Sequence, residues 1–290
     1  MPIATIPEFS IPPLTCGPLH LFGRTLGPLE IQSFGVLTAL GILLAVKLAM
    51  RGAKEQGRDP APIVDFAMWG VLGGVLMGHI VHVLAYHPDE LYLWTSDGRF
   101  NWDILKIWVG LSSMGGLFGG IIAAIAYFRF YARIPFAPYS DAFALGIAPG
   151  WGLARVGCFT VHDHPGVESN FFLAVVQRGS PRHDLGLYEA ILLFAIGALL
   201  WTLHRRKLLR GRLLPLLGVL YGAPRFFLDF LRARPGEFYA NGDPIYADGR
   251  HFGLTFAQFF AIALVVYGVF RLATFKAAGE APRQKRAAAG

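Results

Sequence analysis

The sequence predicts an all-α polytopic membrane protein with about seven transmembrane helices, its N-terminus outside the membrane and its C-terminus in the cytoplasm. Hydrophobic residues make up 54% of the 290 residues and charged residues only 16%, whereas soluble domains carry about 25% charged residues. The 35 glycines and 24 phenylalanines are typical of helices in lipid, because small residues let backbones approach closely. Composition and the two cysteines exclude a disordered chain and a disulfide scaffold.

Seven stretches are apolar over nearly the length of about 20 residues that crosses a bilayer. The fourth contains Pro149, so we expect it to kink. We expect residues 1–33 to form a proline-rich extracytoplasmic arm with no cleavable signal peptide and a short amphipathic piece around 18–31. Residues 34–275 then form one transmembrane domain, and 276–290 a disordered cytoplasmic tail. The predicted spans are 34–50, 62–86, 107–131, 141–159, 187–203, 213–231 and 254–275.

Charge alternates between the two sets of connections, and an excess of Lys and Arg marks the cytoplasmic side. The net charge of +7 is therefore a topology signal, and we expect no nucleic-acid partner. The connections after the first, third, fifth and last spans hold Arg51, Lys54, Arg58, Arg129, Arg133, Arg205, Arg206, Lys207, Arg210, Arg212, Arg271, Lys276, Arg283, Lys285 and Arg286. The opposite connections hold Asp89, Glu90, Asp97, Asp103, Glu168, Asp184, Glu237, Asp243 and Asp248.

Charged side chains within the spans are costly and therefore point to a functional site. Arg155 lies near the outer end of the fourth span, and Arg225 lies four residues before Asp229 in the sixth. One interpretation is that Arg225 and Asp229 merely neutralise each other. The other is that arginines from two helices form an anion site, since the planar guanidinium binds two phosphate oxygens at once. Glu189, at the start of the fifth span, needs a buried partner.

Histidines and glycines in the spans have simpler interpretations. We expect His79 and His82 to pack between helices, and the glycines at 116 and 120 to allow close helix packing. After the fourth span, the residues of His162-Asp163-His164 and His183-Asp184 could bind a metal. We favour a carboxylate that orients an imidazole, and we predict neither a metal nor a cofactor.

Several short motifs occur in one order along the chain. They are Leu-Gly-Pro-Leu at 26–29, Ser-Met-Gly-Gly-Leu-Phe-Gly at 113–119, Ser-Asp at 140–141, Ala-Arg-Val-Gly-Cys-Phe at 154–159, Pro-Arg-His at 181–183 with Leu-Tyr-Glu at 187–189, Tyr-Gly-Ala-Pro-Arg-Phe-Phe at 221–227, and Leu-Thr-Phe-Ala-Gln at 254–258. With these motifs, the chain resembles the prolipoprotein diacylglyceryl transferase family over most of its length.

The resemblance implies an enzyme of lipoprotein biosynthesis in the bacterial cytoplasmic (inner) membrane, with its site toward the outer leaflet. It would move a diacylglyceryl group from phosphatidylglycerol to the lipobox cysteine thiol of a preprolipoprotein. The implied partners are phosphatidylglycerol, preprolipoprotein signal peptides and membrane lipids. The family's functional arginines map onto Arg155 and Arg225, and its acidic partners onto Asp163 and Asp229. The other implied substrate-binding residues are Gly115, Gly116, Gly166, His183, Tyr188 and Glu189.

The chain departs from the family pattern at Met114, where the family has His, and a thioether cannot accept a proton at neutral pH. Further departures are Phe34, His79, Cys158 and Val161-His162. One hypothesis is that another histidine compensates: His162 leads, with His164 and His183 as alternatives. We expect His162 and His164 to point one way and Asp163 the other, toward Arg155. We expect neither Cys16 nor Cys158 to act as a nucleophile.

Two other functions stay open. The first is a divergent relative that binds an anionic phospholipid with altered or lost transferase activity. The second is a seven-span transporter or receptor. A transporter would favour broken helices in corresponding positions of two halves, and only the fourth span is clearly interrupted in the sequence.

Overall fold

The computed structural model describes residues 5–86 and 110–275, apart from positions 22, 23, 27, 111, 246 and 248. Seven helices in these parts are long and apolar enough to cross a membrane, which confirms the predicted fold class. They are α1 (Ser33–Glu55), α2 (Ala61–Tyr86), α3 (Ser113–Ile125), α4 (Ser140–Val161), α5 (Leu185–Arg205), α6 (Leu213–Leu228) and α7 (Phe256–Ala273). Three of these spans also include a short helical segment of another type: the π-helix η3 (Ala126–Tyr131) after α3, the 3₁₀ turn η4 (Ala137–Tyr139) before α4 and the 3₁₀ turn η5 (Asp229–Leu231) after α6. Residues 107–109 of the predicted third span lie outside the described residues.

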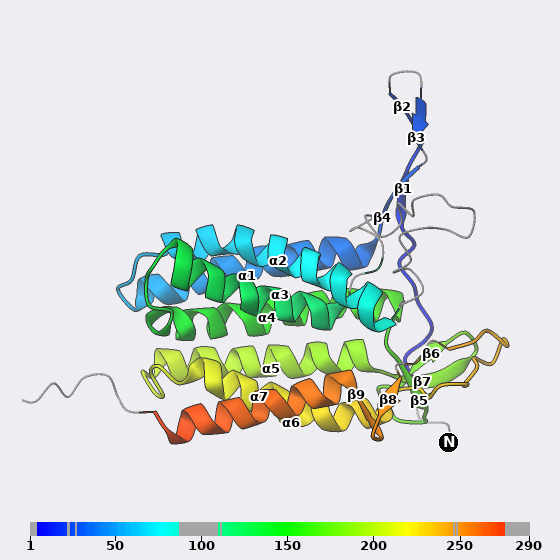
Figure 1. The fold of residues 1–290 in the computed structure, drawn as a ribbon. Helices are drawn as coiled ribbons and strands as arrows, with labels where there is room; N and C mark the ends of the chain where they lie inside the picture. Colours follow the sequence, from blue (N-terminus) through cyan, green and yellow to red (C-terminus); the bar gives the residue numbers. More distant parts are fainter. Residues whose placement is uncertain are drawn as a thin grey trace, which may run out of the picture.

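Helix α4 occupies the middle of the bundle. It packs along α1 on one side and α5 on the other, while α2 packs on α3 and α6 on α7 (Figure 1). Of its span, 61% is buried, more than of any other described span. Its charged side chains, Asp141 and Arg155, are both buried.

Glycines allow α4 to approach α1 so closely. A Cβ atom at Gly146 would lie 2.2 Å from the Ala45 carbonyl oxygen, and one at Gly150 would lie 2.5 Å from that of Gly41. Such distances leave no room for a side chain, so these positions require glycine. The helix continues through Pro149 as one element, and the expected kink stays a prediction. The packing of α1 and α5 along both sides supports the helix there.

The two ends of the bundle differ. The α1–α2, α3–α4 and α5–α6 connections and the end of α7 lie at one end (left in Figure 1), with the basic residues of those connections. Polar contacts tie this end together: Asp141 accepts the backbone N–H groups of Gly211 at 2.5 Å and Leu213 at 2.9 Å, and His204 pairs with Glu55 at 3.1 Å.

A small cap covers the opposite end. Its sheet has the order β5–β7–β6, formed by β5 (Pro165–Glu168), β6 (Val175–Gln177) and β7 (Ser180–Asp184). Arg182 is buried at its centre and donates to the carbonyl oxygens of Gly166 and Phe238, both at 3.0 Å. The same guanidinium pairs with Glu168 and Glu237. A two-stranded ladder of β8 (Arg250–His251) and β9 (Leu254–Thr255) leads into α7.

The N-terminal arm differs from the expected amphipathic piece. Two antiparallel ladders occupy this region, β1 (Leu14–Cys16) with β4 (Leu29–Ile31) and β2 (Leu19–Leu21) with β3 (Arg24–Leu26). They project away from the bundle (Figure 1). Short runs between proline- and glycine-containing turns favour strands over a helix here. Before the ladders, the arm crosses the cap, where Ile6 exchanges two backbone hydrogen bonds of 2.9 Å with Ala174 and Val176.

Close packing of α2 on α3 uses different glycines from those expected. A Cβ atom at Gly119 would lie 2.0 Å from the Gly73 carbonyl oxygen, and one at Gly115 would lie 2.4 Å from that of Met77. The predicted positions, Gly116 and Gly120, have no backbone neighbour closer than 3.8 Å. The contact face is therefore one residue earlier along α3.

This difference gives a matched pair of substitutions. Gly119→Ala should lower the thermal unfolding temperature in detergent by several degrees, because overpacking costs about 1–3 kcal/mol. Gly120→Ala should leave it unchanged or raise it, since Ala is the better helix former by about 1 kcal/mol. Equal unfolding temperatures for the two variants would show that the α2–α3 contact is not as tight as described.

Candidate functional site

Three helices bring buried charges together toward the cap end of the bundle. Glu189, near the start of α5, is fully buried and lies between Arg155 of α4 and Arg225 of α6. Its Oε2 is 3.2 Å from Arg155 Nε, and its Oε1 is 3.4 Å from Arg225 Nε. The hydroxyl of Tyr221 donates a hydrogen bond of 2.7 Å to Oε2. One carboxylate thus holds two guanidinium groups that the chain separates by 70 residues.

A second carboxylate secures Arg225. Arg225 Nη1 lies 2.6 Å from Asp229 Oδ1, and Arg232 Nη1 lies 3.8 Å from the same oxygen. The hydroxyl of Thr255 donates to the other oxygen of Asp229. Thr255 also caps α7 in a reciprocal pair with Gln258. The arginine site is therefore tied to the first turn of α7, and Arg225–Asp229 is more than a self-neutralising pair.

These groups form one wall of a cavity of about 910 Å³. Arg155, Arg225, Arg232 and Asp163 line it, whereas Glu189 and Asp229 are buried behind the arginines. Among the described residues, the charged side chains that face the cavity are thus three arginines and one aspartate. This balance gives the cavity a positive wall.

The rest of the cavity is mostly apolar. Side chains of α1, α2, α3, α4 and α7 line it, among them Ile42, Val71, Leu117, Ile147 and Phe260. Met114, Gly116 and His82 line the same cavity. A positive wall at one side of an apolar cavity suits a ligand with an anionic head and hydrocarbon chains.

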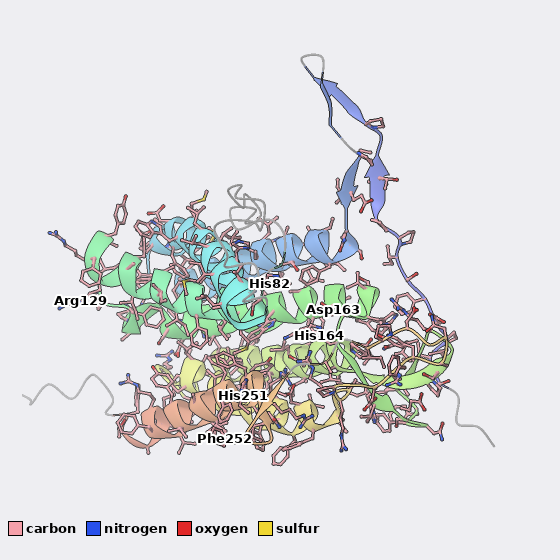
Figure 2. The ribbon with its side chains drawn as sticks, turned by 45° about the vertical axis from the view of Figure 1, so that its right-hand side comes forward. His82, Arg129, Asp163, His164, His251 and Phe252 are labelled. Atoms are coloured by element: carbon pink, nitrogen blue, oxygen red, sulfur yellow. The ribbon has the colours of Figure 1, made fainter. Side chains whose placement is uncertain are left out.

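Asp163 and His164 face this cavity just after α4. His164 Nε2 lies 3.2 Å from Arg155 Nη1, and its Nδ1 lies 2.5 Å from Asp163 Oδ1. Both residues lie between the α1–α4 helices and the α5–α7 helices (Figure 2). Burial raises the pKa of Asp163, but the hydrogen bond from His164 and the charge of Arg155 outweigh it, so the net pKa is lowered. Asp163 is therefore ionised at neutral pH.

His162 is placed differently. Its Nδ1 lies 2.7 Å from Asp184 Oδ2 and its Nε2 lies 2.7 Å from the Phe9 carbonyl oxygen. Burial lowers the pKa of this imidazole, but these two acceptors raise it further than burial lowers it. A ring that donates from both nitrogens has no lone pair to accept a proton. The geometry therefore does not favour the predicted role of His162 as a base, a role that stays untested.

The expectation that His162 and His164 point the same way is wrong. The prediction assumed extended backbone, but His162 ends α4 in the left-handed conformation with a φ of 51°. This turn aims His162 at the N-terminal arm and aims His164 at Arg155. The same expectation pointed Asp163 toward Arg155. In the structure, Asp163 Oδ1 instead lies 2.5 Å from Nδ1 of its neighbour His164.

Other predicted site residues lie in the cap or between helices. His183 Nδ1 is 2.8 Å from the Tyr188 hydroxyl, which lies 3.4 Å from the Leu173 carbonyl oxygen. Among the described residues, the cavity-lining histidines are His82 and His164. A Cβ atom at Gly166 would lie 2.6 Å from the Leu231 carbonyl oxygen. Gly115 likewise packs against α2, so for both glycines the structure supplies a packing requirement.

The described residues include one group that could hold a metal ion. Ligand atoms of Cys158, Asp163 and His164 lie within 4.8 Å of one another. Arg155 Nη1 lies 3.2 Å from the His164 ring and 3.6 Å from Cys158 Sγ, so a guanidinium already contacts two of the three ligands. A cation there would be repelled. His162, His164 and His183 each have separate partners and do not form one cluster.

Comparison with known proteins decides the family. The family model for prolipoprotein diacylglyceryl transferase matches residues 22–274. The chain belongs to the prolipoprotein diacylglyceryl transferase family. It is 32% identical over 218 residues to the phosphatidylglycerol–prolipoprotein diacylglyceryl transferase of Chromohalobacter salexigens, which covers 71% of this chain and 77% of the relative. Proteins of the same name from Pseudoalteromonas atlantica and Symbiobacterium thermophilum are 29% and 28% identical, over 84% and 86% of this chain and 85% and 90% of the relatives. With its seven apolar helices, this member of the family is a multi-pass membrane enzyme of the transferase class.

Sequence reasoning missed several residues that build the site. Tyr221 lies four residues before Arg225, so both point from one face of α6, a spacing that could have been used. Thr255 and Gln258 have the spacing of a helix capping box. Neither pattern revealed that Tyr221 binds Glu189 or that Thr255 binds Asp229, because these contacts join different helices.

The position of Glu189 predicts a large effect on stability. Glu189→Gln leaves two buried arginines without the carboxylate between them, and breaking a buried pair in this way costs about 3–5 kcal/mol. Thermal unfolding in detergent should therefore occur at a clearly lower temperature. Asp243→Asn is the control, because Asp243 pairs with Arg178 at the surface, where a pair contributes about 1 kcal/mol or less. Equal shifts for both variants would contradict the bridging role of Glu189.

The contacts of His162 predict a pH-dependent contribution to stability. A histidine whose pKa is raised in the folded state stabilises the protein fully below its unfolded pKa of about 6.5, and the contribution is lost as the pH rises through the folded pKa. His162→Gln should therefore lower the unfolding temperature more at pH 5.5 than at pH 9. His251→Gln, at an exposed position, should have a small effect at both. A larger effect of His162→Gln at pH 9 would show that the imidazole is neutral.

Proposed function

We propose that this protein transfers the diacylglyceryl group of phosphatidylglycerol to the cysteine thiol of a prolipoprotein signal peptide. The observation that carries the proposal is the pair Arg155 and Arg225, bridged by Glu189, on the wall of an otherwise apolar cavity. The relatives described above are named for diacylglyceryl transfer between phosphatidylglycerol and a prolipoprotein.

The cavity geometry supports a binding mode in which the two parts of the lipid contact different walls. The acyl chains lie among the apolar side chains of α1, α2 and α3, and the phosphate lies against Arg155 and Arg225. As the thiolate sulfur bonds to the glyceryl carbon, the bond from that carbon to the phosphate oxygen breaks and glycerol phosphate leaves. Negative charge builds on the departing phosphate, and arginines held in place beforehand stabilise it.

The charge distribution supports an orientation with the cap outside the cell. The basic connections α1–α2, α3–α4 and α5–α6 share one end of the bundle (Figure 1), and the positive-inside rule puts that end in the cytoplasm. The arginine site lies toward the other end, at the outer leaflet of a bacterial inner membrane. There it would meet signal peptides and membrane lipids.

A divergent function rests on one observation. Met114 lines the cavity at the position where the family pattern has His. A chain whose activity is altered or lost for this reason would bind the anionic lipid without transferring its diacylglyceryl group. Transfer to a lipobox peptide in liposomes of phosphatidylglycerol, followed by mass spectrometry, tests the proposal. A peptide heavier by one diacylglyceryl group supports it, and an unmodified peptide with retained lipid binding supports the divergent function.

The proposal predicts that even a conservative substitution of Arg225 lowers the transfer rate. Arg225→Lys should lower the transfer rate about 100-fold or more, because an ammonium cannot bind two phosphate oxygens in the fork geometry of a guanidinium. Arg129→Lys is the control, since Arg129 is exposed at the far end of the bundle (Figure 2) and should keep the wild-type rate. Full turnover by Arg225→Lys would mean that a point charge suffices.

The orientation is testable with the native cysteines. Cys16 is exposed in the arm and Cys158 is buried, so a membrane-impermeant maleimide should label Cys16 in cells whose outer envelope is opened but whose inner membrane is intact. The double variant Cys16→Ser/Arg58→Cys moves the exposed thiol to the basic end of the bundle. Labelling of this variant should require disruption of the inner membrane. The reverse pattern would invert the proposed topology.

A further inference from the structure

We propose that His164 is the general base of the transfer and that Asp163 is its positioning residue. This assignment rests on the proposed function and adds the group that takes the proton from the acceptor thiol. A thiol with a pKa of about 8.5 is only a few per cent ionised at neutral pH. Transfer at that pH therefore benefits from a base beside the phosphate site.

The neighbours of His164 fix the protonation of its ring. Arginine only donates hydrogen bonds, so the contact of 3.2 Å from Arg155 Nη1 requires a lone pair on Nε2. The carboxylate of Asp163 accepts, so Nδ1, at 2.5 Å, carries the hydrogen. His164 is thus a neutral imidazole with its basic nitrogen toward the arginine. A carboxylate that selects the tautomer of an imidazole is a recurrent arrangement in general-base catalysis.

His164 also lies beside the residues that would bind the phosphate. It lines the cavity together with Arg155 and Arg225, so the base and the phosphate ligands share one wall. His162, by contrast, uses both ring nitrogens on Asp184 and Phe9. Met114 lines the cavity but has no basic lone pair at neutral pH.

The contact with Arg155 couples the base to the lipid. A phosphate oxygen competes for the N–H of Arg155 Nη1, and when it takes that hydrogen bond, the lone pair of Nε2 is released. Nε2 then accepts the thiol proton, the sulfur bonds to the glyceryl carbon, and the carbon–oxygen bond to the phosphate breaks with its electron pair on oxygen. The proton passes from Nε2 to the departing glycerol phosphate, so the imidazole returns to its neutral form.

The charged and titratable groups around His164 come from each element packed against it. They are Asp163 beside it, Arg155 and Cys158 from α4, Glu189 from α5, Arg225 from α6 and Arg232 after η5. We therefore expect the pH profile of transfer to report the whole cluster.

The test is the rate of transfer to a lipobox peptide in phosphatidylglycerol liposomes between pH 6 and pH 9. His164→Gln should lower kcat about 100-fold at pH 7, the usual scale for loss of a general base, with KM for the lipid changed little. The deficit should shrink toward pH 9 as the thiol ionises unaided. In His164→Gly, added imidazole should restore part of the rate, and His251→Gly should show no such response.

Several outcomes would overturn the assignment. A loss in His164→Gln that is equal at all pH values, with no rescue of His164→Gly by imidazole, would assign His164 a structural role on Arg155. An unchanged rate in His164→Gln with a large loss in His82→Gln would move the base to His82, which lines the same cavity. Absence of transfer by the wild-type protein would instead refute the proposed function.

Discussion

One buried carboxylate, Glu189, is the constraint on which the polar centre of this protein depends. Two guanidinium groups in the interior of a membrane protein are costly unless they are paired. Glu189 pairs with both, and Asp229 pairs with Arg225 from the other side. Because both carboxylates are fully buried behind the arginines, the positive charge faces the cavity. The arrangement stabilises the fold and prepares a site for an anion at the same time.

The cap and the membrane helices are joined at the residue that starts α5. Asp184 caps this helix by accepting the backbone N–H of Leu187 at 3.0 Å, and it also binds His162 and Gln177. His162 in turn binds the N-terminal arm at Phe9. The arm, the cap and the helix that carries Glu189 therefore share one carboxylate. Asp184 precedes Glu189 by five residues along the chain, so the arm is linked to the start of the helix that carries Glu189.

Close backbone contacts position the rest of the cavity. Gly146 and Gly150 let α4 approach α1, and Gly119 lets α3 approach α2. These contacts set the distance between the apolar walls and the arginine wall. Protein interiors are packed so tightly that one added methyl group in such a contact is felt. The shape of the cavity is therefore a consequence of glycine positions that the chemistry does not use.

Much of the fold could be predicted from the sequence. Spans of apolar residues and the alternation of basic connections depend on local composition, so they predicted seven helices and the shared end of the basic connections that the structure describes. Arg155, Arg225 and Glu189 stood out because charges in spans are costly. Their mutual contact could not be predicted, since it depends on how three helices pack.

The direction of the histidines escaped prediction for a different reason. A single left-handed residue, His162, turns the chain after α4, and nothing in the neighbouring residues requires glycine-like backbone there. The same limit applies to the arm, where two short ladders replaced the expected amphipathic piece. Backbone conformation at one residue decided which imidazole faces the cavity.

The central claim is that Arg155 and Arg225 bind the phosphate of a lipid, and equilibrium binding tests it most directly. Fluorescent phosphatidylglycerol and fluorescent diacylglycerol, which lacks the phosphate, would be titrated into the purified protein in detergent without acceptor peptide. The wild-type protein should bind phosphatidylglycerol at least 10-fold more tightly, and the double variant Arg155→Gln/Arg225→Gln should lose this preference while still binding diacylglycerol. An equal preference in the wild-type protein and the double variant would contradict the account.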